Sequence, residues 1–294
     1  MEKMKFMYEI FLKKITLIII IIIIVIFITT TGCKLSGNPD IIKATAINDG
    51  RDLEIVWKKV ENADSYDLYC DQVAVGSTKR NSYTIPGPWY YCDFFGCSKG
   101  GYTCNKIEVI AHPFLGGDIR KSSLNISPKS FRILDLASHD ISDNSWIKID
   151  FSTSEIKVVS ENEVDPSIPN TGWIIFFNNS GKPELRDIET TGKGSTNIVI
   201  SFGRKNYFTP YLAPDSENYN KTITISSGDE IFFWADNKEK GYGSIDTNDY
   251  FGIIIVKSLI EGEDPSIYRG EGPYKVDLEI FIQDKVRGLR WIKY

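Results

Sequence analysis

The chain has 294 residues, of which 42% are hydrophobic and 25% are charged, and its formal net charge is −5 at pH 7. This hydrophobic content is enough for packed cores and excludes global disorder, and the length allows two domains of ordinary size. The acidic balance argues against nucleic acid as a partner, because nucleic-acid binding needs a clustered basic face.

The first 32 residues have the organisation of an export signal. Four lysines, at positions 3, 5, 13 and 14, precede a fully apolar run of 12 residues, Leu17 to Ile28. That length suits the apolar region of a signal peptide and is short for a membrane-spanning helix, which needs about 20 apolar residues. An uncleaved anchor from about Phe11 to Thr31 is the alternative, and it also leaves the residues after 37 outside the cytoplasm.

Thr29-Thr30-Thr31-Gly32-Cys33 follows the apolar run. Small residues directly before a cysteine at this place resemble the lipobox of bacterial lipoproteins, although Thr30 stands where that family prefers Leu, Val or Ile. The resemblance implies a signal peptide at 1–32, a lipid on the Cys33 thiol and a lipidated tether at 33–37. It also implies attachment to a lipid bilayer of the bacterial cell envelope, on the extracytoplasmic side. Without residues 1–32 the chain keeps 30 basic and 37 acidic side chains.

Residues 38–128 alternate apolar and polar side chains in short runs separated by turn residues, which is the pattern of a β-sandwich. In the clearest run Leu53, Ile55 and Trp57 share one face. The expected strands are 53–57, 65–69, 73–75, 82–85, 107–111 and 124–126.

These segments resemble a fibronectin type III domain. Leu53–Trp57 with Val60 looks like the second strand and its core tryptophan, while 63–69 looks like the third strand and 81–87 like the fifth. Ile107–Ala111 resembles the sixth strand, with Ile107 in place of the usual tyrosine. The resemblance covers about 90 residues and implies a spacer or binding module, and a family fold does not name a ligand.

If Cys33 carries lipid, an even number of cysteines remains in an exported chain, which predicts two disulfides with three possible connectivities. We favour one bond from the first cysteine to the loop that holds the other three, and one bond within that loop. A zinc site is the alternative, but a CxxC pair is lacking and His112 is the only nearby histidine. The four cysteines are Cys70, Cys92, Cys97 and Cys104.

The segment between Pro86 and Asn105 interrupts the sandwich pattern with a high density of aromatic side chains. Such a loop on a rigid scaffold is a candidate contact surface for an unknown protein or glycan. The alternative, which we favour from the composition, is a disulfide-stapled loop that covers a small core of its own. The binding candidates are Trp89, Tyr90, Tyr91, Phe94 and Phe95.

Residues 131–294 show little helical periodicity, which predicts a second β-sandwich or a flattened barrel, and therefore an all-β fold. Trp173–Phe177 and Ile253–Val256 are continuous apolar runs, typical of strands covered on both faces. Alternation over Val276–Ile282 predicts a strand with one face mostly toward solvent. The expected strands are 146–151, 155–159, 173–177, 197–202, 222–225, 231–234, 251–257, 276–282 and 289–292.

A second resemblance is confined to some 30 residues. Ile149–Ile156 followed by Gly172–Phe176 looks like the opening of HmuY-type haem-binding lipoproteins, which are all-β surface proteins. Haem capture in that family implies histidine ligands, and the only histidine of this part of the chain, His139, precedes the similar segment. We therefore expect no cofactor.

Residues for catalysis are scarce. The two histidines, His112 and His139, fit surface positions, and the nucleophile-elbow, phosphate-loop and zinc-protease motifs do not occur. Asp246–Asp249 offers oxygens to Ca²⁺ but fits a polar turn first, and the tryptophans at 173, 234 and 291 fit a β-core better than a sugar-stacking site. We expect no catalytic residue and no metal. A binding, adhesion or accessory module is favoured over an exported carbohydrate-active hydrolase or a haem-binding lipoprotein.

Overall fold

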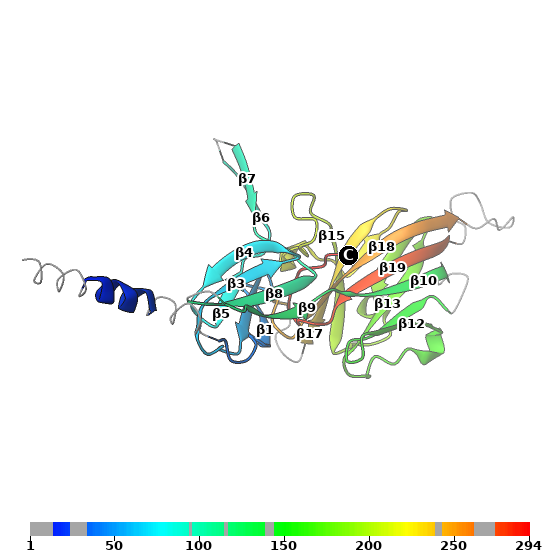
Figure 1. Cartoon of the computed structure of the whole chain (residues 1–294). Coiled ribbons are helices and arrows are strands. Elements are labelled where there is room, and N and C mark those ends of the chain that lie inside the picture. Colours follow the sequence, from blue (N-terminus) through cyan, green and yellow to red (C-terminus); the bar gives the residue numbers. More distant parts are fainter. Residues whose placement is uncertain are drawn as a thin grey trace, which may run out of the picture.

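The computed structural model describes residues 14–23, 34–93, 96–114, 117–138, 144–238, 243–261 and 274–294. Nearly all regular structure in these ranges is antiparallel β, which confirms the predicted all-β class. Two β-sandwiches lie side by side, the N-terminal one in blue to green and the C-terminal one in green to red (Figure 1). Residues 14–23 are helical, and no helix in the described part of the chain is long and apolar enough to cross a membrane.

The N-terminal sandwich packs a three-stranded sheet, in the order β1-β2-β5, against a four-stranded sheet, in the order β4-β3-β8-β9. Its core follows the predicted alternation, because Leu53, Ile55 and Trp57 are all fully buried. Ile107, in place of the expected tyrosine, is fully buried too. The strands are β1 (Ile41–Ile47), β2 (Asp52–Trp57), β3 (Ala63–Cys70), β4 (Val73–Thr78), β5 (Ser82–Ile85), β8 (Lys106–Pro113) and β9 (Arg120–Asn125).

The ordered body begins before residue 38. Leu35 is 3% exposed and belongs to the core of the N-terminal sandwich, and the amide of Ser36 donates to the carbonyl of Glu61. Of the expected tether, residues 34–37 are described, and their packing leaves almost no free length between position 33 and the fold.

The two expected disulfides are present. Cys70 of β3 bonds to Cys104, and Cys92 bonds to Cys97 within the aromatic insertion, which confirms the two expected bonds and identifies one of the three connectivities left open by the sequence. The predicted lipidation residue, Cys33, lies outside the described residues.

The C-terminal sandwich consists of two five-stranded sheets, in the orders β10-β19-β18-β17-β15 and β12-β11-β13-β14-β16, which stay separate and do not close into a barrel. The described parts of its connections contain three short 3₁₀ helices: η1 (Glu161–Glu163), η2 (Ile188–Thr191) and η3 (Ser216–Asn218). The strands are β10 (Lys129–Ala137), β11 (Trp146–Asp150), β12 (Glu155–Val159), β13 (Thr171–Asn179), β14 (Lys182–Asp187), β15 (Ile198–Arg204), β16 (Thr222–Thr224), β17 (Glu230–Asn237), β18 (Tyr250–Glu261) and β19 (Tyr274–Gln283).

The continuous apolar runs are covered on both faces, as predicted. In β13, Ile174 and Phe176 enter the core between the sheets, while Trp173 and Ile175 enter a second cluster on the outer face. In β18 the same division places Ile254 between the sheets and Ile253 outside. The alternation of β19 also holds, with its apolar positions buried and its acidic positions partly exposed.

In the C-terminal sandwich, two strands were missed and one expected strand is absent. In the N-terminal part, β1 and the strands at 89–93 and 96–100 were not expected either. β10 carries a register shift between Ile133 and Leu136, and this bulge breaks the alternation that would have revealed the strand. β14 contains Pro183 and four charged residues, a composition that argues against a strand. Residues 289–292 form a single bridge, from Trp291 to Leu212, and no strand.

The C-terminal segment after β19 returns to the N-terminal sandwich. Leu289 and Trp291, 0% and 1% exposed, belong to the core of that sandwich. The amide of Arg290 donates to the carbonyl of Gly50, in the turn between β1 and β2. Gly50 has φ +74°, and a Cβ there would overlap the carbonyl oxygen of Gly288, so the close approach needs glycine. The two sandwiches therefore share one core at their junction.

Candidate functional site

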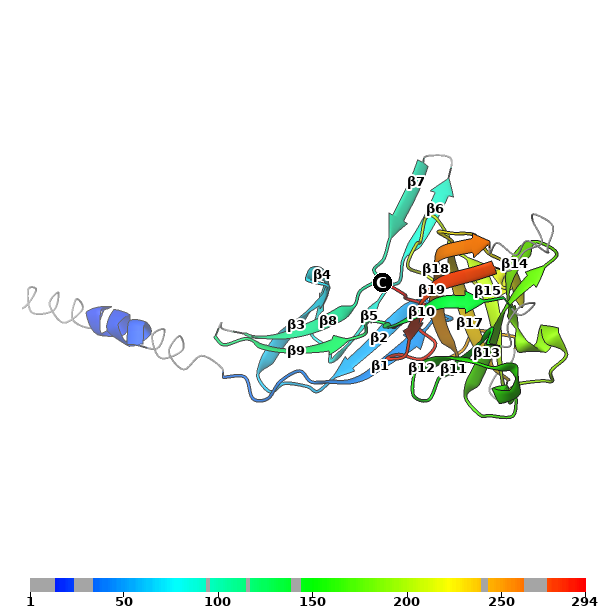
Figure 2. The same ribbon diagram turned by 90° about the vertical axis from the view of Figure 1, so that its right-hand side faces the viewer.

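The aromatic insertion forms an antiparallel hairpin of β6 (Trp89–Asp93) and β7 (Gly96–Gly100), which projects from the junction of the two sandwiches (Figure 2). The Cys92–Cys97 disulfide links its two strands near the tip. Trp89 pairs with Gly100, where an added Cβ would lie 2.6 Å from the indole, so glycine lets this ring lie across the neighbouring strand. With 44% of its surface exposed, Trp89 is open to a partner.

Strand alternation divides the predicted aromatic cluster. Successive side chains of a strand point to opposite faces, so Tyr90 faces away from Trp89. Phe94, Phe95 and the side chain of Tyr91 lie outside the described residues. Among the described residues, the hydrophobic clusters include no side chain of the hairpin, so the favoured small core of its own is not found there.

Tyr90 stacks on a ring of the other sandwich. Its centroid lies 4.0 Å from that of Phe208, and the two planes differ by 6°. Phe208 belongs to the long loop between β15 and β16, residues 205–221, and makes an edge contact with Tyr207. Tyr207 is 88% exposed and Phe208 is 52% exposed. We call Tyr90, Tyr207 and Phe208 the junction patch.

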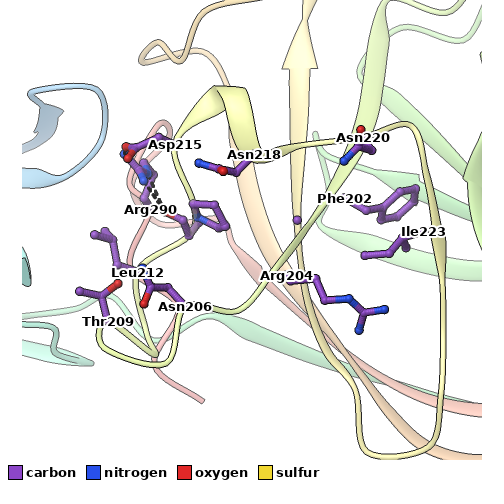
Figure 3. Close-up of a pocket in the computed structure, with 13 residues that line it drawn as sticks. Phe202, Arg204, Asn206, Thr209, Leu212, Asp215, Asn218, Asn220, Ile223 and Arg290 are labelled. Carbon is purple, nitrogen blue, oxygen red and sulfur yellow. Dashed lines mark hydrogen bonds and ion pairs between the residues drawn. The ribbon is translucent and has the colours of Figure 1, made fainter.

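A pocket of about 390 Å³ opens beside the patch, between β15 and the same loop (Figure 3). Asn206 and Thr209, which flank the exposed aromatic pair in sequence, both line it. Its lining combines apolar side chains with amides, a hydroxyl and charged groups. The lining residues are Phe202, Gly203, Arg204, Asn206, Thr209, Leu212, Ala213, Pro214, Asp215, Asn218, Asn220, Ile223 and Arg290.

The charges of the pocket are already paired. Arg290 is 2% exposed, and its guanidinium donates to Asp215 at 2.7 Å and to the carbonyl of Ala213 at 2.8 Å. Arg204 bonds to Asp229 and to the carbonyl of Thr224, both at 2.8 Å. The pocket thus presents two neutralised pairs and no isolated charge among its lining residues.

The geometry of the pocket does not support the hydrolase or haem alternatives. Asp215 is the only carboxylate among the lining residues, whereas glycoside hydrolysis generally uses two. The lining also contains no His, Cys, Met or Tyr, which are the usual protein ligands of haem iron.

Two buried carboxyl groups elsewhere have strongly raised pKa values. Burial raises the pKa of Asp249 to about 7, although Trp234 Nε1 donates to this carboxyl at 2.9 Å. Burial likewise raises the pKa of Asp187 to about 6, while the amides of Glu189 and Ile200 donate to it. The amide of Ile200 belongs to the opposite sheet, so Asp187 ties the two sheets together. Both carboxyls have structural partners and lie outside the pocket lining.

The other candidate residues from the sequence are paired with neighbours, buried in the core or outside the described residues. Nε2 of His112 lies 2.9 Å from Asp67 on the neighbouring strand, and His139 is outside the described residues. Asp249 accepts from Trp234, which leaves it inside a hydrogen-bonded turn, and no cluster of three potential metal ligands occurs in the described ranges. The three tryptophans with a sugar-stacking alternative are at most 5% exposed, so they are core residues: Trp173, Trp234 and Trp291.

Sequence reasoning missed the loop at 205–221 and therefore most of the junction patch. The available signal was Asn206-Tyr207-Phe208-Thr209-Pro210-Tyr211, in which aromatic residues stand among turn formers between two strands. No family model matches this chain, and no curated protein is significantly similar to it in sequence.

Proposed function

We propose that this chain is a lipid-anchored, extracytoplasmic binding module that holds its partner on the junction patch. The observation that carries the proposal is the exposure of Tyr207 and Phe208, 88% and 52%, on a stack that joins the two sandwiches. Exposed aromatic side chains on a rigid base are typical anchors of binding surfaces, because little conformational entropy is lost when they are covered.

The course of the chain supports a membrane anchor at one end and a binding site at the other. Ile41 pairs with Trp57 at the start of β1, and Ile47 pairs with Asp52 at its end, next to the junction. The chain thus enters the N-terminal sandwich at the end opposite the C-terminal one (Figure 2). A lipid on Cys33 would lie two residues from buried Leu35, within about 7 Å of extended chain. Such an anchor would keep the N-terminal sandwich near the bilayer and the junction patch away from it.

The strand order of the N-terminal sandwich supports its assignment as a fibronectin type III-like spacer. Sheets of three and four strands, β1-β2-β5 and β4-β3-β8-β9, agree with the strand positions implied by the sequence resemblance. The hairpin β6–β7 is then an insertion between the fifth and sixth strands of that fold. Its place brings Tyr90 to Phe208 and makes the spacer part of the binding surface.

The anchor is tested by Cys33→Ser. This substitution removes the thiol that would carry the lipid, so we expect a chain that is neither lipidated nor cleaved before position 33. Mass spectrometry of the protein from the envelope measures both. A wild-type mature N-terminus elsewhere, without lipid, would contradict the anchor.

The binding surface is tested with the full chain in proteoliposomes, applied to arrays of immobilised glycans and extracellular proteins. Tyr207→Ala should weaken binding to the recognised ligand by about 2 kcal/mol if this ring is a hot spot. Phe114→Ala is the matched control, because Phe114 is 72% exposed and follows β8 at the end of the sandwich remote from the junction. Equal affinities of wild type and Tyr207→Ala would refute the junction patch as the binding surface.

A further inference from the structure

We propose that the pocket beside the junction patch binds one residue of a neutral saccharide. This inference rests on the proposed function, because the patch and the pocket are built by the same loop, 205–221. It adds the chemical class of the ligand, which the exposed aromatic rings alone do not define.

The free hydrogen-bonding groups of the pocket match a polyhydroxylated ligand. Within the described part of the chain, the side-chain amides of Asn218 and Asn220 have no hydrogen-bonding partner, and both are exposed. An amide offers two donors and an acceptor, which pairs with hydroxyl groups that also donate and accept. Figure 3 shows both residues along one limb of the loop, with Asn206 and Thr209 on the other limb.

The paired charges favour a neutral ligand over an acidic one. Asp215 holds Arg290, and Asp229 holds Arg204, so an anion would have to compete with an existing carboxylate for either guanidinium. A neutral hydroxyl can instead hydrogen-bond at the edge of these pairs without displacing either partner.

The size of the pocket and its apolar lining agree with a single small ring. About 390 Å³ lies near the lower limit of ligand pockets, which span about 300–1,000 Å³. Leu212 and Ile223 add apolar surface to the lining, against which the C–H face of a sugar can pack. Tyr207 is exposed and adjoins the lining residue Asn206 in sequence, and its ring offers an aromatic face to the next residue of a saccharide chain.

The test compares two variants of the full chain in proteoliposomes on an array of neutral and sialylated glycans, followed by calorimetric titration with the bound oligosaccharide. Asn218→Ala/Asn220→Ala removes the free amides without breaking a described hydrogen bond, so the thermal unfolding midpoint should not change. We expect its affinity to fall on the order of 10- to 100-fold, as for the loss of two or more hydrogen bonds. Asn162→Ala is the control, because Asn162 is an exposed amide in η1, outside the pocket lining.

The outcomes separate this inference from the proposed function. Loss of neutral-glycan binding in the double variant, with Asn162→Ala unaffected, supports the saccharide pocket. Binding that Tyr207→Ala abolishes but Asn218→Ala/Asn220→Ala leaves intact overturns the pocket and preserves the patch. Recognition of proteins alone, or of sialylated glycans alone, also overturns the inference. Absence of binding to any glycan or protein on the arrays overturns both proposals.

Discussion

Trp291 lies three residues from the C-terminus, yet its substitution should destabilise the N-terminal sandwich. The side chain is 1% exposed in that core, and Nε1 donates to the carbonyl of Arg51 at 2.6 Å. Truncation of a buried tryptophan to alanine typically costs about 3–5 kcal/mol, because packing is lost and a cavity remains. Trp291→Phe keeps most of the packing and should lose mainly the hydrogen bond, about 0.5–1.5 kcal/mol.

Hydrogen exchange followed by mass spectrometry measures this effect strand by strand. In Trp291→Ala, the amides of β2 and β8 should exchange on the order of 10²- to 10³-fold faster, as for a loss of about 3–4 kcal/mol. Trp173→Ala is the control, because Trp173 is buried on the outer face of β13 in the C-terminal sandwich and should leave β2 and β8 protected. Unchanged protection of β2 and β8 in Trp291→Ala would refute the shared core.

Three further predictions concern stability and function. Asp249 binds a proton more tightly in the folded state, with a pKa of about 7 against an ordinary value of 3.8, so its contribution to stability is present at low pH and is lost between about pH 4 and pH 7. Between pH 5 and pH 8, the melting temperature of Asp249→Asn should therefore fall less than that of the wild type in scanning calorimetry. Melting temperatures that fall in parallel with pH would contradict this. The Cys70–Cys104 bond closes a separation of 34 residues. Its reduction should therefore lower the unfolding free energy of the N-terminal sandwich by about 3–4 kcal/mol, which denaturant titrations measure. Four free thiols in protein from the envelope would rule the bond out. His112→Ala and His139→Ala should leave ligand binding on the arrays unchanged, since His112 lies at the end of β8 remote from the junction. Loss of binding in either variant, with intact folding, would contradict this.

The strands that could be predicted are those whose local sequence pattern indicates which of their faces are buried. Alternation revealed β2, β3 and β19, and continuous apolar runs revealed strands with two buried faces. The even number of cysteines predicted two disulfides, but the sequence did not indicate their pairing, because each of the three connectivities joins Cys70 to the loop. β10 and β14 were missed because a bulge and a proline hide the period on which such predictions depend.

The shared core and the junction patch could not be predicted, because both depend on contacts between distant segments. The hydrogen bond from Trp291 to Arg51 spans 240 residues, and nothing in residues 286–292 indicates which core receives them. Tyr90 and Phe208 are likewise brought together only by the packing of two sandwiches. The sequence pointed to the aromatic hairpin and not to the loop that meets it.

The return of the C-terminal segment has a consequence for the order of folding during synthesis. The strands of the N-terminal sandwich emerge first, and the C-terminal sandwich has its own core between two complete sheets. Leu289 and Trp291, however, reach the core of the first sandwich only after the C-terminal sandwich has been synthesised. The sandwich that is made first is therefore completed last, and until then its open core is an exposed apolar surface.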